Sequence, residues 1–203
     1  MQLDIRPLEG RFVRLEPLAP EHREALLALF ETDAEAWDVN SVAGCGGDFD
    51  VWWTEAEGAF VAGARQVYVA RSLRDAAVLG TVSFFNPRPA GRVVELGAVL
   101  LSAQARREPA QVEVFNLMLA HAFGCGAMRV EFLVDTRASR SRAAVEKLGA
   151  AREGVLRRHT ITAAGQVRDT AVFSIVDLDW PAIEARQRYQ LSEAFVPAMA
   201  RAA

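Results

Sequence analysis

The segment Val93–Leu101 constrains the fold more than any other part of the sequence. Its residues, VVELGAVLL, are almost all apolar. A short, nearly continuous apolar run of this kind is typical of a central strand that is buried on both faces of a sheet. A loop with two arginines, Arg106 and Arg107, follows this strand, and Pro109 is a favourable first residue for a helix. We therefore expect a buried strand that leads through a short basic loop into the N-terminus of a helix.

The rest of the chain divides into strands and helices by the spacing of its apolar residues. The predicted strands cover residues 12–16, 67–70, 78–84, 93–101, 128–134, 154–162 and 167–176. The predicted helices cover residues 21–30, 51–62, 109–123 and 139–148, with a last helix opened by Trp180-Pro181. Strands follow one another in the middle of the chain and alternate with helices later. This order predicts an α+β (mixed α/β) fold with a mixed sheet and helices on both faces.

Composition and charge narrow the function classes. A formal net charge of −3 over 203 residues argues against nucleic-acid binding, which needs a basic surface. Cys45 and Cys125 lie far apart in the sequence, so we expect reduced thiols and no metal site. The first residues lack the apolar region of a signal peptide, and no apolar stretch is long enough to span a bilayer. We therefore expect a cytoplasmic protein that binds neither membranes nor nucleic acids.

The junction between the buried strand and the following helix is a candidate anion site. A helix N-terminus offers free backbone N–H groups and the positive end of the helix dipole, so it suits a pyrophosphate group. Arg106 and Arg107 can add charge-assisted hydrogen bonds to phosphate. The alternative is that this is an ordinary loop-to-helix junction with solvated arginines.

Five stretches resemble, in order, those of the GNAT superfamily of N-acetyltransferases, in the branch that contains the RimJ/RimL enzymes. They are LEGRFVRLEPL, VELGAVLL, QARREPAQVEVFNLMLAHAF, MRVEFLVDTRASRSRAAVEKLGAAREGVLR and GQVRDTAVFSIVDLDWP. The resemblance implies the GNAT fold, with a mostly antiparallel sheet of about six to seven strands. It also implies a single domain over residues 1–203. In that domain 1–65 holds the first strand and the acceptor-side helices, 66–180 the acetyl-CoA-binding core and 181–203 a C-terminal tail.

The function that this resemblance implies is transfer of an acetyl group from acetyl-CoA to a primary amine. The amine belongs either to a protein N-terminus, as in the ribosomal-protein enzymes, or to a small molecule. The alternative is a catalytically weak or inactive GNAT-fold module that binds acyl-CoA or regulates a partner. Homodimers are common in the family, and the tail after Trp180 is one segment that could contribute to a dimer. The acceptor loops, residues 31–50 and 157–168, do not indicate the acceptor.

The resemblance also assigns a cofactor site. The residues it implies are Val99, Leu100, Leu101, Arg106, Arg107, Ala110, Gln111, Val112, Ala138 and Ser141. Two features depart from the family pattern. Arg107 and Pro109 stand where the phosphate loop usually has glycines, and Pro109 has no N–H to donate. Ala138 stands where the family usually has an asparagine that contacts the pantetheine arm. Loss of that hydrogen bond is expected to weaken binding by about 1 kcal/mol.

Three residues are candidates for catalysis. Glu95, on the buried strand, is a candidate base, and its alternative role is an ion pair or a charge at the strand edge. His159 is a second candidate for proton relay, although a single histidine is more often a polar surface residue. Ser141 is the candidate partner of the departing thiolate, and a backbone N–H near Leu100 or Leu101 is expected to stabilise the oxyanion. His22 and His121 are expected to be structural, and Asp169 is expected to pair with an arginine.

Overall fold

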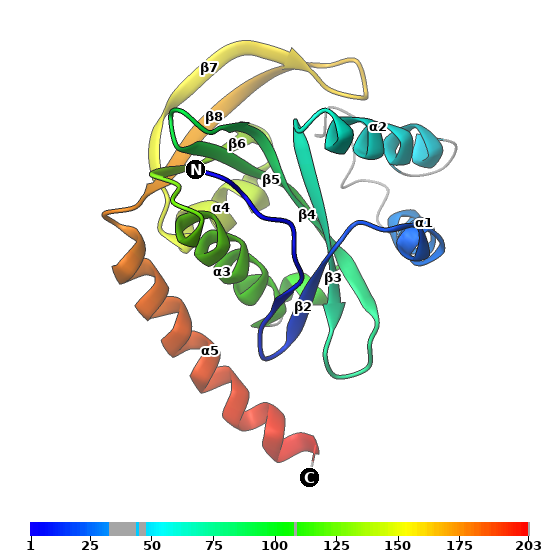
Figure 1. The fold of residues 1–203 in the computed structure, drawn as a ribbon, viewed down its shortest axis with the longest axis vertical. Coiled ribbons are helices and arrows are strands. Elements are labelled where there is room, and N and C mark those ends of the chain that lie inside the picture. Colours follow the sequence, from blue (N-terminus) through cyan, green and yellow to red (C-terminus); the bar gives the residue numbers. More distant parts are fainter. Residues whose placement is uncertain (33–43, 45–47, 108, 203) are drawn as a thin grey trace.

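The computed structural model describes residues 1–32, 44, 48–107 and 109–202, which form one eight-stranded sheet and five α-helices. The strands are β1 (Leu8–Glu9), β2 (Val13–Pro17), β3 (Arg65–Ser72), β4 (Val78–Arg88), β5 (Val93–Leu101), β6 (Arg129–Asp135), β7 (Ala151–Ile161) and β8 (Val167–Val176). The helices are α1 (Arg23–Phe30), α2 (Phe49–Val61), α3 (Pro109–Gly124), α4 (Ser139–Leu148) and α5 (Trp180–Ala202). Figure 1 shows the helices on both sides of the sheet.

The strand order in the sheet is β1-β2-β3-β4-β5-β6-β8-β7. Every neighbouring pair is antiparallel except β5 and β6, which are parallel. The predicted mixed, mostly antiparallel sheet with helices on both faces is therefore confirmed. The strand that the sequence did not predict is β1, which has two residues and is too short to display an alternating pattern.

Each face of the sheet packs against its own set of helices. The main apolar core lies under α3, where Val114, Met118 and Leu119 are fully buried against strands such as β5 and β6. A smaller core on the other face joins α1 and α2 to Val69 of β3 and includes Trp52. Because α1 and α2 cover only the β2–β4 side of that face, its β4–β8 side is left for a cleft.

A buried carboxylate fastens the first strands to α3. Glu113 is only 3% exposed, and its two oxygens accept the backbone N–H groups of Arg11, Phe12 and Val13 at 2.7, 2.6 and 2.8 Å. Gly10 lies so close that a Cβ there would fall 2.2 Å from the Glu113 side chain. This contact sets the position of the β1–β2 turn on the helix that follows β5.

The parallel strands β5 and β6 pair only over their first residues, Val93–Glu95 with Arg129–Glu131. Beyond Glu95, β5 continues to pair with β4, and its register with β4 shifts around Ala98, whose φ is +44°. The carboxyl-terminal part of β5 therefore has an edge that faces away from β4 and is not paired with β6. The helices α3 and α4 begin shortly after β5 and β6 end, so both N-termini lie beyond this gap.

Candidate functional site

A cleft of about 370 Å³ opens on the face of the sheet that α1 and α2 cover only in part. Trp52 and Glu55 of α2 form one wall, and His159 and Thr160 of β7 form the opposite wall. The remaining lining residues come from the strands between them: Arg65, Phe85, Asn86, Glu95, Gly97, Ala98, Leu100, Leu133 and Arg168. The cleft thus combines an apolar and aromatic floor with acidic, basic and imidazole side chains, as small-molecule sites commonly do.

Strand register places three of these residues in one row. Phe85 of β4 is the pairing partner of Arg65 on one side and of Glu95 on the other. Directly paired residues project from the same face of a sheet, and neighbouring strands lie about 4.8 Å apart, so the backbones at Arg65 and Glu95 are roughly 10 Å apart. A cation and a carboxylate therefore stand on either side of an aromatic ring.

Glu95 is half-buried and lines the cleft. Its Oε2 accepts a 3.3 Å hydrogen bond from the side-chain amide of Asn86, and its Oε1 lies beside Gly97, where an added Cβ would come within 3.5 Å. Burial raises the pKa of Glu95 above its usual value, against the opposing effects of the Asn86 hydrogen bond and the nearby Arg168 charge. A half-buried carboxylate with a raised pKa can accept a proton at a pH closer to neutral than an exposed one.

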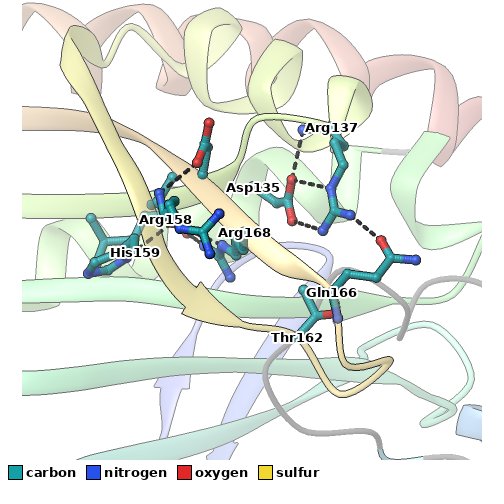
Figure 2. A network of polar contacts seen from close by, with 10 residues as sticks. Asp135, Arg137, Arg158, His159, Thr162, Gln166 and Arg168 are labelled. Carbon is teal, nitrogen blue, oxygen red and sulfur yellow. Dashed lines mark hydrogen bonds and ion pairs between the residues drawn. The ribbon is translucent and has the colours of Figure 1, made fainter.

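His159 reaches the cleft because β7 is bulged beside it. The register between β7 and β8 shifts in this region, and Arg158 has a positive φ of +50°. Asp169 holds the bulge by accepting the Arg158 backbone N–H at 2.6 Å. The sequence predicted that Asp169 pairs with an arginine. Its hydrogen bond is to the backbone of Arg158, and its charge also acts on the guanidinium of Arg137, whose pKa it raises. His159 is an exposed residue, and its Nδ1 atom lies 3.1 Å from the hydroxyl of Thr170 (Figure 2).

Arg168 is a cleft residue that the sequence reasoning missed. Its guanidinium donates to the hydroxyl of Thr170 at 3.0 Å and to the carbonyl of Leu133 at 2.7 Å, which fixes it between the strands (Figure 2). Burial lowers its pKa, while the charges of Asp135 and Glu95 act in the opposite direction. A charged residue in a strand that is otherwise largely apolar was the signal available in the sequence.

The β5 edge places three predicted cofactor residues near one another. Of Val99, Leu100 and Leu101, only Leu100 lines the cleft. The Ser102 N–H donates to Leu79 of β4 at 2.8 Å. Since successive N–H groups of a strand point to opposite sides, the Leu101 N–H points away from β4 and toward the gap beside β6.

The predicted phosphate residues lie just beyond that gap. Arg106 and Arg107 belong to a 3-10 helix, Ala105–Arg107, that directly precedes α3. Arg106 is half-buried, and its backbone N–H donates to the Ser102 carbonyl at 3.0 Å. The other predicted residues, Ala110, Gln111 and Val112, form the first turn of α3, where backbone N–H groups lack acceptors within the helix.

Ser141 and Ala138 lie at the start of α4, and neither is among the described residues that line the cleft. Ala138 is the N-cap residue and has no side-chain group to cap the helix, while Ser141 is exposed in the first turn. The structure thus brings Glu95, Leu100 and His159 together in the cleft and places Ser141 outside it.

The two histidines predicted to be structural have partners away from the cleft. His22 bonds Glu16 at 2.9 Å, and His121 bonds the backbone carbonyl of Asp4 at 2.9 Å. The Cys125 thiol also donates to the Asp4 carboxylate at 3.2 Å, so α3 holds the N-terminal segment through a small polar cluster. The potential ligand atoms of Asp4, His121 and Cys125 lie within 4.8 Å of one another.

The sequence matches the acetyltransferase (GNAT) domain family over residues 13–151. A candidate acetyltransferase from T. thermophilus is 36% identical, with a TM-score of 0.83 over 94% of this chain and 100% of that one. A GCN5-related N-acetyltransferase from Brucella melitensis is 27% identical, with a TM-score of 0.85 over 93% of this chain and 86% of that one.

Mycobacterium smegmatis RimJ, solved in complex with CoA-disulfide, has a TM-score of 0.76 over 93% of this chain and 94% of its own. At 18% identity this similarity concerns the fold alone. No curated protein matches the chain by sequence. Among the described residues, no helix is both long and apolar enough to cross a bilayer.

Proposed function

We propose residue roles and an acceptor class for this chain, which belongs to the GNAT acetyltransferase family. The family match and the similar solved structures confirm the GNAT family that the sequence motifs predicted, and the chain is an acetyl-CoA-dependent acetyltransferase. The acceptor that we propose is a primary amine that enters the cleft beside β5. The observation that carries this proposal is Glu95, a half-buried carboxylate that lines a cleft next to the unpaired edge of β5.

The first requirement of the reaction is a neutral amine, because an ammonium ion has no lone pair with which to attack the thioester carbon. We assign its deprotonation to Glu95, whose raised pKa suits it to accept that proton. His159 lies on the opposite wall of the same cleft and is the alternative acceptor, directly or through a water. The attack forms the C–N bond, and collapse of the tetrahedral species breaks the C–S bond and releases the thiolate of CoA. The attacking nitrogen loses one further proton to become an amide, which balances the proton that the thiolate gains.

The second requirement is stabilisation of the negative charge that develops on the thioester oxygen. The Leu101 N–H is the donor we favour, because alternation along β5 directs it into the gap beside β6. Ser141, at the first turn of α4, remains the candidate for protonating the thiolate. Because Ser141 lies outside the cleft that we assign to the amine, its position suits a proton donor to the thiolate of CoA.

The third requirement is a binding site for the pyrophosphate of acetyl-CoA. The chemistry of the junction between β5 and α3 fits this group, since it combines first-turn N–H groups of a 16-residue helix with Arg106. By its place in the sequence Arg107 is a second arginine at this junction, and its side chain lies outside the described part of the structure. Pro109 removes one donor from that turn. We propose that the two arginines compensate for it, together with the N–H groups of the first turn of α3.

The test is CoA release with acetyl-CoA and a panel of acceptors: peptides with free N-termini, polyamines, amino acids and simple alkylamines. The proposal expects CoA release with at least one amine and a rise in thermal stability with acetyl-CoA, because a ligand that binds only the folded state stabilises it. A chain that acetyl-CoA stabilises but that acetylates no amine would instead be the binding module considered from the sequence. Absence of any stabilisation at millimolar acetyl-CoA would contradict both roles.

A further inference from the structure

Arg65 is a buried cation that has no ion pair among the residues that the structure describes. The side chain is only 6% exposed, yet it lines the cleft. Among the described residues its hydrogen-bond partner is the Ser83 hydroxyl, which its Nε reaches at 3.2 Å. Glu55, an exposed residue of α2 that also lines the cleft, acts on Arg65 through its charge and not through a hydrogen bond.

Aromatic rings make this burial tolerable. The guanidinium carbon of Arg65 lies 4.8 Å from the centre of the Phe85 ring and 5.6 Å from that of Trp52. Burial lowers the pKa of Arg65 to about 10, so the group still carries its charge at neutral pH. Burying a charge without a hydrogen-bonded counter-ion costs free energy, which ring contacts recover only in part. If Arg65 served packing alone, an apolar side chain of similar volume would fill the same space without the cost of burying a charge.

We propose that Arg65 binds a carboxylate of the acceptor, so that the substrate is an amine carrying a carboxylate on the same molecule. The inference rests on the proposed amine acetylation and specifies its acceptor. Arg65 and Glu95 flank Phe85, with their backbones roughly 10 Å apart. The amine is held near Glu95, and the carboxylate meets the planar guanidinium, whose geometry suits bidentate contact.

Two sources can supply such a carboxylate: a free amino acid or short peptide, or an acidic side chain close to the N-terminus of a protein. A series of ω-amino acids, from glycine through 4-aminobutyrate to 6-aminohexanoate, measures the preferred spacing when each is compared with its own carboxamide. Tripeptides with aspartate or asparagine at the second position, all amidated at the C-terminus, test the protein-like source.

The variants are Arg65→Met and Arg65→Lys, with Arg71→Met as the matched control. Arg71 lies on the same strand but pairs with Glu16 at 3.1 Å, away from the cleft. The proposal expects Arg65→Met to raise KM for the preferred carboxylated amine by about tenfold to a hundredfold and to leave that for its carboxamide within about twofold. Arg65→Lys is expected to keep part of the preference, and Arg71→Met all of it. Thermal unfolding of each variant separates these effects from loss of fold.

Wild-type enzyme that acetylates amines with no preference for a carboxylate would overturn this inference and leave the proposed function intact. Equal losses for acid and amide in Arg65→Met would also overturn it, since they indicate a purely structural arginine. No acetylation of any amine by the wild type contradicts the proposed function and this inference together.

Discussion

Substitution of Glu113 by glutamine tests how the N-terminal strands are held on α3. The carboxylate accepts three backbone N–H groups at 2.6–2.8 Å while only 3% exposed. Glutamine keeps one acceptor oxygen and presents an NH2 group where the other oxygen stood. At least one buried N–H then faces a donor, and the remaining bonds lose their charge assistance. Because hydrogen bonds to charged groups contribute about 1.5–3 kcal/mol each, we expect a loss of roughly 2–4 kcal/mol in the free energy of unfolding.

Urea denaturation followed by circular dichroism measures this loss. With a slope of about 2 kcal/mol per molar urea, the midpoint should fall by roughly 1–2 M. Glu184→Gln is the matched control, because Glu184 is on a helix, α5, and makes an i,i+4 ion pair with the exposed Arg188. Its expected loss is below about 0.5 kcal/mol. A loss in Glu113→Gln as small as in this control would refute the reasoning.

Two further predictions concern the cleft and the proposed acetyl-CoA site. Ala138→Asn restores the amide that the family usually has at this position and should lower KM for acetyl-CoA roughly fivefold, the equivalent of about 1 kcal/mol. The control is Ala138→Ser, whose side chain can cap α4 but is too short to replace the amide. An equal fall in KM in both variants would attribute the change to capping. Arg168→Met should move the acid limb of the kcat/KM–pH profile to higher pH. The Arg168 charge lowers the pKa of Glu95, so its removal raises that pKa, and a base must be deprotonated to act. An acid limb that stays in place or moves to lower pH would contradict this interaction between Arg168 and Glu95.

The sequence predicted most of the fold because the pattern along each element was strong. The apolar run Val93–Leu101 is β5 with the same bounds, and Pro109 opens α3 as expected. Gly149, in the left-handed region at φ +104°, ends α4, as predicted for a helix that stops at glycine. The strand after it begins at Ala151, earlier than the predicted Gly154, since the chain extends immediately after that cap.

The site was less accessible to sequence reasoning, because its residues meet through pairing across strands. Glu95 and His159 were identified as candidates, and both line the cleft. Arg65 and Arg168 were missed, although they line it too. Arg65 begins a strand that the apolar pattern placed at Val67, so nothing local distinguished it from a solvated arginine. Only the register with Phe85 brings it into the row that contains Glu95. Most of the first acceptor loop, residues 33–43 and 45–47, lies outside the described residues.

The most direct test of the central claim is the pH dependence of kcat for wild-type enzyme and Glu95→Gln, measured by CoA release at saturating acetyl-CoA and amine. We expect the variant to lose about a hundredfold or more of kcat near neutral pH and to regain rate as rising pH supplies neutral amine without help from the enzyme. A Glu95→Gln enzyme with unchanged kcat across the whole pH range would contradict the assignment of Glu95 as the base.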